Sequence, residues 1–257
     1  MLTNYLTATQ NLLQLPQAPT TLYSTANLTT FINTARGQLA GEAQCIRAIG
    51  TVPTVAGQQA YNFSSINLGT PSTTGIQGVI NIQQISYNLG VGQQWIHSRP
   101  WAWFFLYQVG NPNPLVNPDT GVVGSPPIVW SQYQQGAAPS AGIGNQVGGS
   151  FYVNIPDDVY TLNCDCSCYP IPLVNDSTPE AIPYLWTDAV PFFAAYYALL
   201  TSQMQARMSD ALRYLELYKE FVKRAREASN PSQLRWMYQG AVDVPSAMQM
   251  GVKGGAG

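Results

Sequence analysis

The stretch Gly78-Val79-Ile80-Asn81-Ile82-Gln83-Gln84-Ile85-Ser86-Tyr87 decides the fold of this 257-residue chain. It is rich in β-branched residues, and its apolar and polar side chains alternate as they do in a strand with one buried face. The alternation slips at Gln83-Gln84, and a slip of this kind often marks a β-bulge. The stretch therefore predicts a strand that carries a bulge.

Shorter strand patterns surround this stretch between residues 51 and 174. They are separated by Gly- and Pro-rich segments, the longest of which are 111–125 and 136–150. The patterns cover 60–63, 128–130, 151–155 and 159–162. Several short strands joined by such turns predict an antiparallel β-sandwich or barrel.

Helical patterns lie on both sides of the strand region. In residues 24–48 apolar side chains recur at steps of three and four, Ser24 or Thr25 can cap the start, and Gly50 suits the position after the end. A short helix is expected before this segment. Residues 187–206 and 209–228 predict a helical hairpin.

The sequence therefore predicts an α+β fold. In this fold, the N-terminal helix and the C-terminal helical hairpin form a helical bundle, an antiparallel β-sandwich or barrel is inserted between them, and an extended tail follows. The expected boundaries are 1–50 for the N-terminal helices, 51–175 for the β domain, 176–228 for the hairpin and 229–257 for the tail.

Charged residues are scarce and unevenly placed. Lys and Arg number 11 and Asp and Glu 13, which is 9% of the chain, against about 25% in typical soluble domains. Three of the basic residues precede position 181 and eight follow it. A net charge of −2 disfavours a simple nucleic-acid-binding protein, which needs a basic field. Weak repulsion between copies favours assembly.

No membrane association is expected. The longest apolar stretch, 189–200, is shorter than the roughly 20 residues that a transmembrane helix needs. The first residues lack the basic region of a signal peptide.

Cys164, Cys166 and Cys168 form the only pattern that suggests a metal site. Alternate residues of a strand share a face, but structural zinc usually takes four ligands, and the fourth would have to be Cys45 or His97. Buried thiols are the interpretation that the spacing favours. We therefore expect no metal and no cofactor.

The sequence contains no convincing catalytic constellation. His97 is the only histidine, and no nucleophile motif lies near it. Asp157-Asp158 suits a turn better than acid–base catalysis. The aromatic run 101–107 could stack on nucleic-acid bases, but Arg99 is the only cation beside it, so packing in a core or interface is favoured. We expect a protein that is not an enzyme.

Two groups of residues are candidates for contacts with partners. The first is a basic face on the last helix, which could line a channel or an interface or remain a solvated face: Lys219, Lys223, Arg224 and Arg226. The second is a set of large apolar side chains in the tail, which could dock onto a partner or fold back on the same subunit: Leu234, Trp236, Met237 and Tyr238.

Four short motifs occur in a recognisable order. They are Phe31-Ile32-Asn33-Thr34-Ala35, Gly57-Gln58-Gln59-Ala60-Tyr61, Gly124-Ser125-Pro126-Pro127-Ile128-Val129-Trp130 and Ile155-Pro156-Asp157-Asp158-Val159-Tyr160-Thr161-Leu162. Followed by the closing hairpin, this order resembles the head–tail adaptor (connector or tail-tubular) proteins of tailed bacteriophages. The chain departs from the family pattern at Trp130, where Tyr is common, and in the cysteine segment 164–168.

This resemblance implies a structural protein of the virion neck, assembled in the host cytoplasm. It implies a ring, usually a homo-dodecamer, that binds the portal protein on one side and a downstream tail or nozzle protein on the other. The ring would extend the channel through which double-stranded DNA passes, and the tail 229–257 would reach the portal. The alternatives are another β-rich virion component, such as a tail or capsid decoration protein, and a small hydrolase or glycan-binding module.

Overall fold

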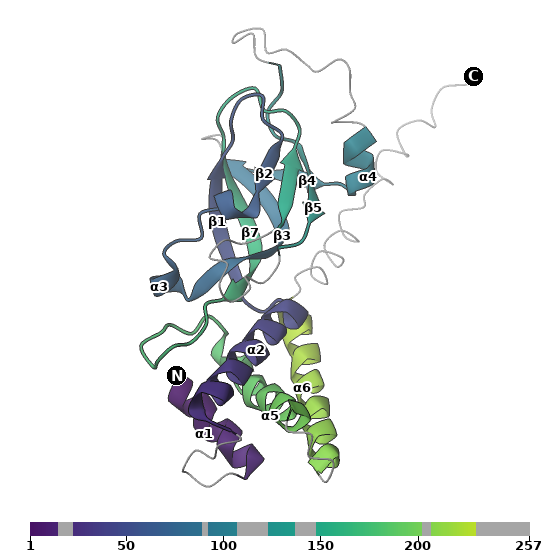
Figure 1. The fold of residues 1–257 in the computed structure, drawn as a ribbon. Helices are drawn as coiled ribbons and strands as arrows, with labels where there is room; N and C mark the ends of the chain where they lie inside the picture. Colours follow the sequence, from purple (N-terminus) through teal and green to yellow (C-terminus); the bar gives the residue numbers. More distant parts are fainter. Residues whose placement is uncertain (15–22, 89–91, 107–122, 137–147, 202–206, 230–257) are drawn as a thin grey trace, which may run out of the picture.

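The computed structural model describes residues 1–14, 23–88, 92–106, 123–136, 148–201 and 207–229 (Figure 1). Four longer helices gather at one end of the molecule and a sheet lies at the other. The longer helices are α1 (Leu2–Leu13), α2 (Thr25–Ala43), α5 (Ala189–Thr201) and α6 (Met208–Ser229). Shorter helical segments are η1 (Phe63–Ser65), α3 (Pro71–Thr74), α4 (Trp101–Phe104) and η3 (Tyr184–Trp186). No helix among these residues is long and apolar enough to cross a membrane.

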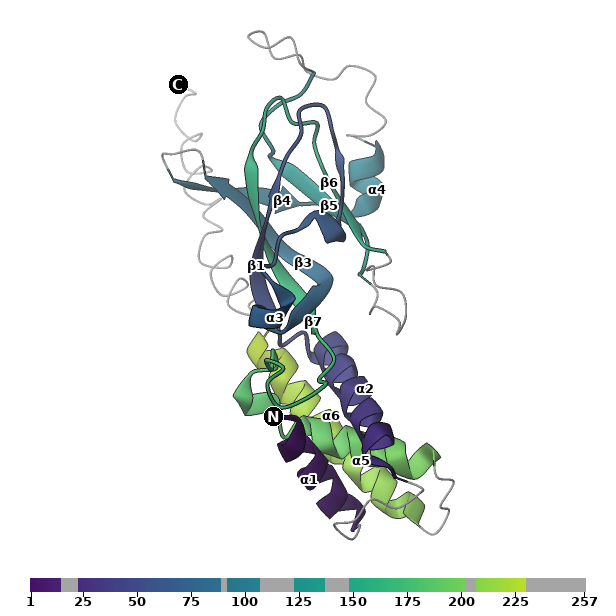
Figure 2. The ribbon, with the colours of Figure 1, turned by 60° about the vertical axis from the view of Figure 1, so that its left-hand side comes forward.

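The described strands form one seven-stranded sheet with the order β1-β7-β3-β4-β5-β6-β2. They are β1 (Arg47–Pro53), β2 (Ala60–Asn62), β3 (Ile76–Asn88), β4 (Gln93–Ser98), β5 (Val129–Gln134), β6 (Ser150–Val153) and β7 (Thr161–Pro170). The two edge strands, β1 and β2, follow each other in the chain, and only residues 54–59 separate them. The sheet therefore curls into a half-barrel, which Figure 2 shows from a second side.

The long strand β3 accommodates this curvature with three shifts in its register against β7. One of them lies between Ile82 and Gln84, so the bulge predicted from Gln83-Gln84 is confirmed. Each such shift leaves a residue unpaired and bends the strand, because two residues on one strand then oppose one on the other.

The predicted fold class, a helical bundle with an inserted antiparallel sandwich or barrel, is wrong. The described strands make a single curled sheet, and β4 and β5 within it run parallel, with His97 opposite Val129. A glutamine side chain links two strands of this sheet that are not neighbours in the strand order. The Oε1 atom of Gln132 accepts the Ile82 amide at 3.0 Å, and its Nε2 atom donates to Asn81 at 3.0 Å. Gln132 therefore ties β5 to β3 beyond the region where β4 lies between them.

One hydrophobic core extends from the sheet into the helices. Ile85 and Leu162 of the sheet belong to the same buried cluster as Leu39 of α2 and Tyr218 of α6. Burying one such side chain completely contributes about 1.5–3 kcal/mol to folding. The helical end and the sheet consequently stabilise each other through shared side chains.

Helix α2 begins as predicted and ends earlier. The Ser24 hydroxyl accepts the Asn27 amide at 3.2 Å, which confirms the cap. The helix ends at Ala43 because Gln44 adopts a left-handed conformation with φ of 51°. Gly50 is therefore not the residue after the helix. It lies inside β1, where a Cβ atom would collide with the Ile66 side chain.

Candidate functional site

Three of the four basic residues predicted as a face of α6 share one line on that helix. Lys219, Lys223 and Arg226 are spaced by four and three residues, which places them on one side of an α-helix. Arg224 projects from a different side, where its guanidinium lies 3.7 Å from Glu220. All four side chains are exposed. The structure thus separates Arg224 from the other three.

The line of cations ends at a small pocket of about 80 Å³. The pocket lies where the C-terminal ends of α2 and α6 meet β1 and β3. Its lining residues are Ala43, Gln44, Arg47, Gln83, Arg226 and Ser229. Arg47 is held in place by Asp165, to which its Nε atom donates at 3.0 Å and its Nη2 atom forms a second, shorter contact. Its Nη1 atom donates to the carbonyl oxygen of Ser229 at 3.0 Å.

An aromatic surface covers the outer side of β5 and β6. The Trp101 ring of α4 packs 4.7 Å from the Tyr133 ring and 4.6 Å from the Tyr152 ring, measured between ring centres. Phe104, the last residue of α4, is buried, whereas Phe105 remains 52% exposed and Tyr133 50% exposed. We call Trp101, Phe105, Tyr133 and Tyr152 the outer aromatic surface. The aromatic run 101–107 thus splits, within its described part, between side chains that pack on the sheet and side chains that face solvent.

One cation accompanies this surface. The Arg99 guanidinium lies over the Trp103 ring at 5.2 Å from its centre, which is the geometry of a cation–π contact. His97 is exposed on the neighbouring strand β4. The predicted docking residues of the tail, by contrast, fall outside the described part of the chain: Leu234, Trp236, Met237 and Tyr238.

The four cysteines are buried free thiols. Cys164, Cys166 and Cys168 occupy alternate positions of β7 and belong to the main core, together with Cys45. Burial raises the pKa of Cys45 to about 11 and those of Cys164 and Cys168 to about 12. In the described ranges no group of three His, Cys, Asp or Glu side chains could hold a metal ion.

The raised pKa values of these thiols predict that the protein loses stability in alkaline solution. An unfolded cysteine ionises near pH 8.5, whereas the buried thiols stay protonated at that pH. The unfolded chain therefore releases protons first, and the free energy of unfolding falls from about pH 9, by up to about 1.4 kcal/mol per thiol and pH unit. Urea titrations between pH 7 and 10.5 measure this slope. The Cys45→Ala variant should show a shallower slope, and equal slopes would contradict the assignment.

The acidic pair Asp157-Asp158 builds a turn. The Tyr160 hydroxyl donates to Asp157 at 2.8 Å, and the Thr54 hydroxyl donates to the Asp158 carbonyl oxygen at 3.0 Å. Thr54 Oγ1 in turn accepts the Tyr160 amide at 2.7 Å. Burial and the nearby Asp157 carboxylate raise the pKa of the Tyr160 hydroxyl. The Asp158 carboxylate accepts the Val159 amide at 2.7 Å, so both aspartate side chains have a structural role just before β7.

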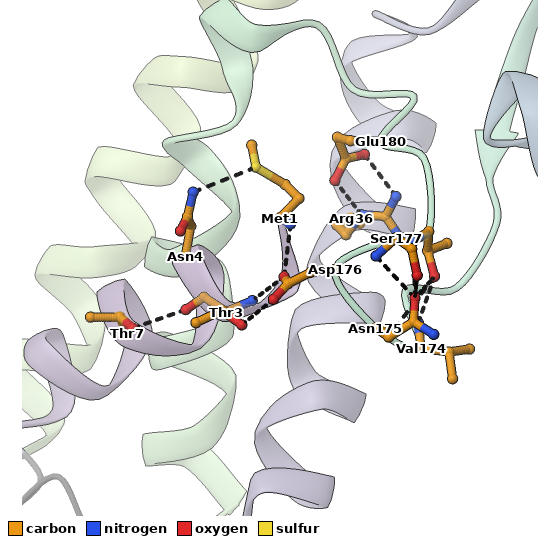
Figure 3. A network of polar contacts seen from close by, with 11 residues as sticks. Met1, Thr3, Asn4, Thr7, Arg36, Val174, Asn175, Asp176, Ser177 and Glu180 are labelled. Atoms are coloured by element: carbon orange, nitrogen blue, oxygen red, sulfur yellow. Dashed lines mark hydrogen bonds and ion pairs between the residues drawn. The ribbon is translucent and has the colours of Figure 1, made fainter.

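The sequence analysis missed an ion pair between α2 and the segment before α5, shown in Figure 3. Arg36 is only 1% exposed, and its Nε and Nη2 atoms donate to the Glu180 carboxylate at 3.0 and 2.7 Å. Its Nη1 atom donates to the Ile171 carbonyl oxygen at 2.7 Å. A signal was present, because Arg36 lies among the apolar positions of its helix.

The loop that carries this glutamate is tied to α1 as well (Figure 3). Asp176 accepts hydrogen bonds from the Met1 amine and the Thr3 amide, both at 2.8 Å, and these contacts hold its pKa well below the usual range. Asn175 accepts the amides of Ser177 and Thr178 at 3.1 and 3.0 Å. The loop between β7 and η3 is therefore held against both α1 and α2.

Comparison of the sequence with protein-family models and with curated proteins finds no match. No residue described above therefore takes a role from a relative, and a proposal about function rests on the sequence motifs and the geometry of the chain itself.

Proposed function

We propose that the protein is a structural component of a tailed-phage particle, a head-to-tail adaptor that assembles into a ring between the portal and the tail and performs no catalysis. The observation that carries the proposal is a nearly uncharged sheet with large apolar side chains left in solvent. Such surfaces usually mark contacts with other proteins.

Among the exposed apolar side chains of the described residues, two groups lie on different parts of the chain, as a ring requires. One is the outer aromatic surface on the sheet. The other is η3 and its neighbourhood, where Tyr184 is 85% and Leu185 74% exposed. A closed ring is built from heterologous contacts, in which one surface of a subunit binds a different surface of the next. Two unlike apolar surfaces on one chain fit this type of contact.

The scarcity of cations suits a passage for DNA. Between Arg47 and Arg207 the sequence contains one basic residue, Arg99. Each contact between a cation and a phosphate adds salt-dependent affinity, so a lumen with few cations lets the duplex slide. The surface of the sheet could line or border such a lumen without gripping DNA.

Assembly is the direct test of the proposal. The purified chain, alone and mixed with the portal protein, is analysed by light scattering after gel filtration and by negative-stain electron microscopy. We expect rings, or rings formed on the portal. A protein that stays monomeric and never binds the portal would contradict the adaptor function.

A glycan-binding module is the second candidate, and the outer aromatic surface favours it. The exposed Tyr133 and Phe105 rings could stack on sugar rings. A glycan array read with the wild-type protein and with Tyr133→Ala separates the two functions. Retention of a glycan that the variant loses would support the second candidate over the first.

Removing the tail should weaken docking onto the portal while the fold persists. The truncation begins after Asn230, because the Ser229 carbonyl oxygen accepts a hydrogen bond from Arg47. We expect at least a tenfold loss of portal affinity in sedimentation experiments, with an unchanged melting temperature. Alanine at Leu234, Trp236, Met237 and Tyr238 in the full chain should reproduce the loss. Unchanged docking in both variants would assign the portal contact to another surface.

A further inference from the structure

We propose that the pocket between the ends of α2 and α6 binds a phosphate group. Its lining offers two guanidinium groups, from Arg47 and Arg226, and two carboxamides, from Gln44 and Gln83, and it contains no carboxylate. Hydrogen-bond donors therefore outnumber acceptors in a pocket of about 80 Å³. A small oxyanion with several acceptor oxygens is the ligand that such a lining suits.

Arg47 is preorganised for this ligand. A guanidinium has five N–H donors, and the contacts to Asp165 and Ser229 use three of them. Two donors remain on a side chain whose position is already fixed, so binding costs little conformational entropy. The Asp165 carboxylate neutralises the charge of Arg47, so the attraction of an anion to the pocket must come from a second cation.

Arg226 supplies that second charge. It lies in the last turn of α6, and no ion pair to it is found in the described part of the chain. Lys223, one turn earlier on the same side of the helix, strengthens the positive field. Arginine binds phosphate oxygens through two parallel hydrogen bonds, which gives the site geometric selectivity as well as charge.

The carboxamides complete the donor set. Gln83 Nε2 donates to Gln44 Oε1 at 2.9 Å, so the amide group of Gln44 keeps both of its own N–H donors. Two helix C-termini point at this place, and their carbonyl groups alone would repel an anion. Contacts of the protein offset that repulsion, because the Ser229 carbonyl binds Arg47 and the Ala40 carbonyl binds the Gln44 amide at 3.0 Å.

Titration of the full chain with inorganic phosphate, followed by calorimetry and by NMR of arginine side chains, tests the site. Chloride at equal ionic strength is the reference. The Arg226→Gln variant should bind phosphate about 10- to 100-fold more weakly, as expected for the loss of a charge-assisted hydrogen bond. Arg224→Gln is the matched control, because it removes the same charge from the same helix outside the pocket. It should leave the affinity within about twofold of the wild type.

A short DNA duplex distinguishes the possible sources of the phosphate. If Arg226→Gln lowers duplex binding and Arg224→Gln does not, the site holds a backbone phosphate. If both variants retain equal duplex binding while Arg226→Gln alone loses inorganic phosphate, the ligand is a small phosphate compound. No effect of phosphate beyond that of chloride, or equal losses of phosphate in the two variants, would overturn the proposal. These outcomes do not depend on whether the protein forms a ring.

Discussion

Replacing Glu180 with alanine should lower the free energy of unfolding by about 3–5 kcal/mol, the cost of leaving a buried charge without its partner. Arg36 is almost completely buried, and the Glu180 carboxylate accepts hydrogen bonds from its Nε and Nη2 atoms. Without the carboxylate, the guanidinium keeps its hydrogen bonds to Asn33 and Ile171 but has no counter-charge. Urea unfolding at pH 7, followed by circular dichroism, measures the loss.

Glu220→Ala is the matched control for this prediction. Glu220 also faces an arginine, Arg224, but both side chains are about two-thirds exposed and 3.7 Å apart. An exposed pair contributes between zero and about 1 kcal/mol, so this variant should remain close to the wild type.

The double variant Arg36→Met/Glu180→Leu separates the cost of an unpaired buried charge from the contribution of the packing of the two side chains. It removes the buried charges together and should recover most of the stability, because two apolar side chains need no counter-charge. Similar losses in Glu180→Ala and Glu220→Ala would show that Arg36 finds other compensation. A double variant no more stable than Glu180→Ala would show that the shape of the pair matters more than its charge.

Local patterns predicted local structure in this chain. The Ser24 cap and the bulge at Gln83-Gln84 depend on neighbours within a few residues, so the sequence contains the information for both. The last helix was also predicted closely, since the pattern gave 209–228 and α6 spans Met208–Ser229. Its apolar stripe is long and regular, and such a stripe is a strong signal for a helix.

Contacts between distant segments could not be predicted in the same way. Arg36 and Glu180 are 144 residues apart, and no local sequence pattern near either residue identifies the other as its partner. Strand β4 buries only Ile96 among its six residues, so it lacks the alternation that marks a strand. The parallel pairing of β4 with β5 and the bridge from Gln132 to β3 follow from how the sheet curls. The strand patterns alone fit one curled sheet and two stacked sheets equally well.

The candidate site shows the same division. The spacing of Lys219, Lys223, Arg224 and Arg226 predicted an exposed basic face, but only the fold reveals that Arg226 meets Arg47 in a pocket. Arg47 reaches it from β1, and residue 165 on another strand fixes its direction. The pattern of a helix contains no information about a partner 179 positions away, so the pocket could not be predicted from the sequence.

Replacing Asn154 with alanine should lower the free energy of unfolding by about 2–4 kcal/mol, because two backbone amides and a carbonyl group, in a buried to partly buried site, lose their partner. Asn154 is buried directly after β6. Its Oδ1 atom accepts the amides of Ile128 and Val129 at 2.8 and 3.1 Å, and its Nδ2 atom donates to the Pro126 carbonyl oxygen at 3.0 Å. Thermal and urea unfolding measure the total loss, and hydrogen exchange at the amides of residues 128 and 129 localises it.

Asn62→Ala provides the control, since Asn62 is exposed beside the same part of the sheet and its side chain caps no helix. A surface substitution of this kind stays within about 0.5 kcal/mol of the wild type. Asn154→Asp should fall between the two, because a carboxylate still accepts both amides but cannot donate to Pro126. If Asn154→Ala matched Asn62→Ala, another contact would have to hold residues 125–129. The expected ranking instead makes one buried carboxamide the physical link between residues 125–129 and the end of β6.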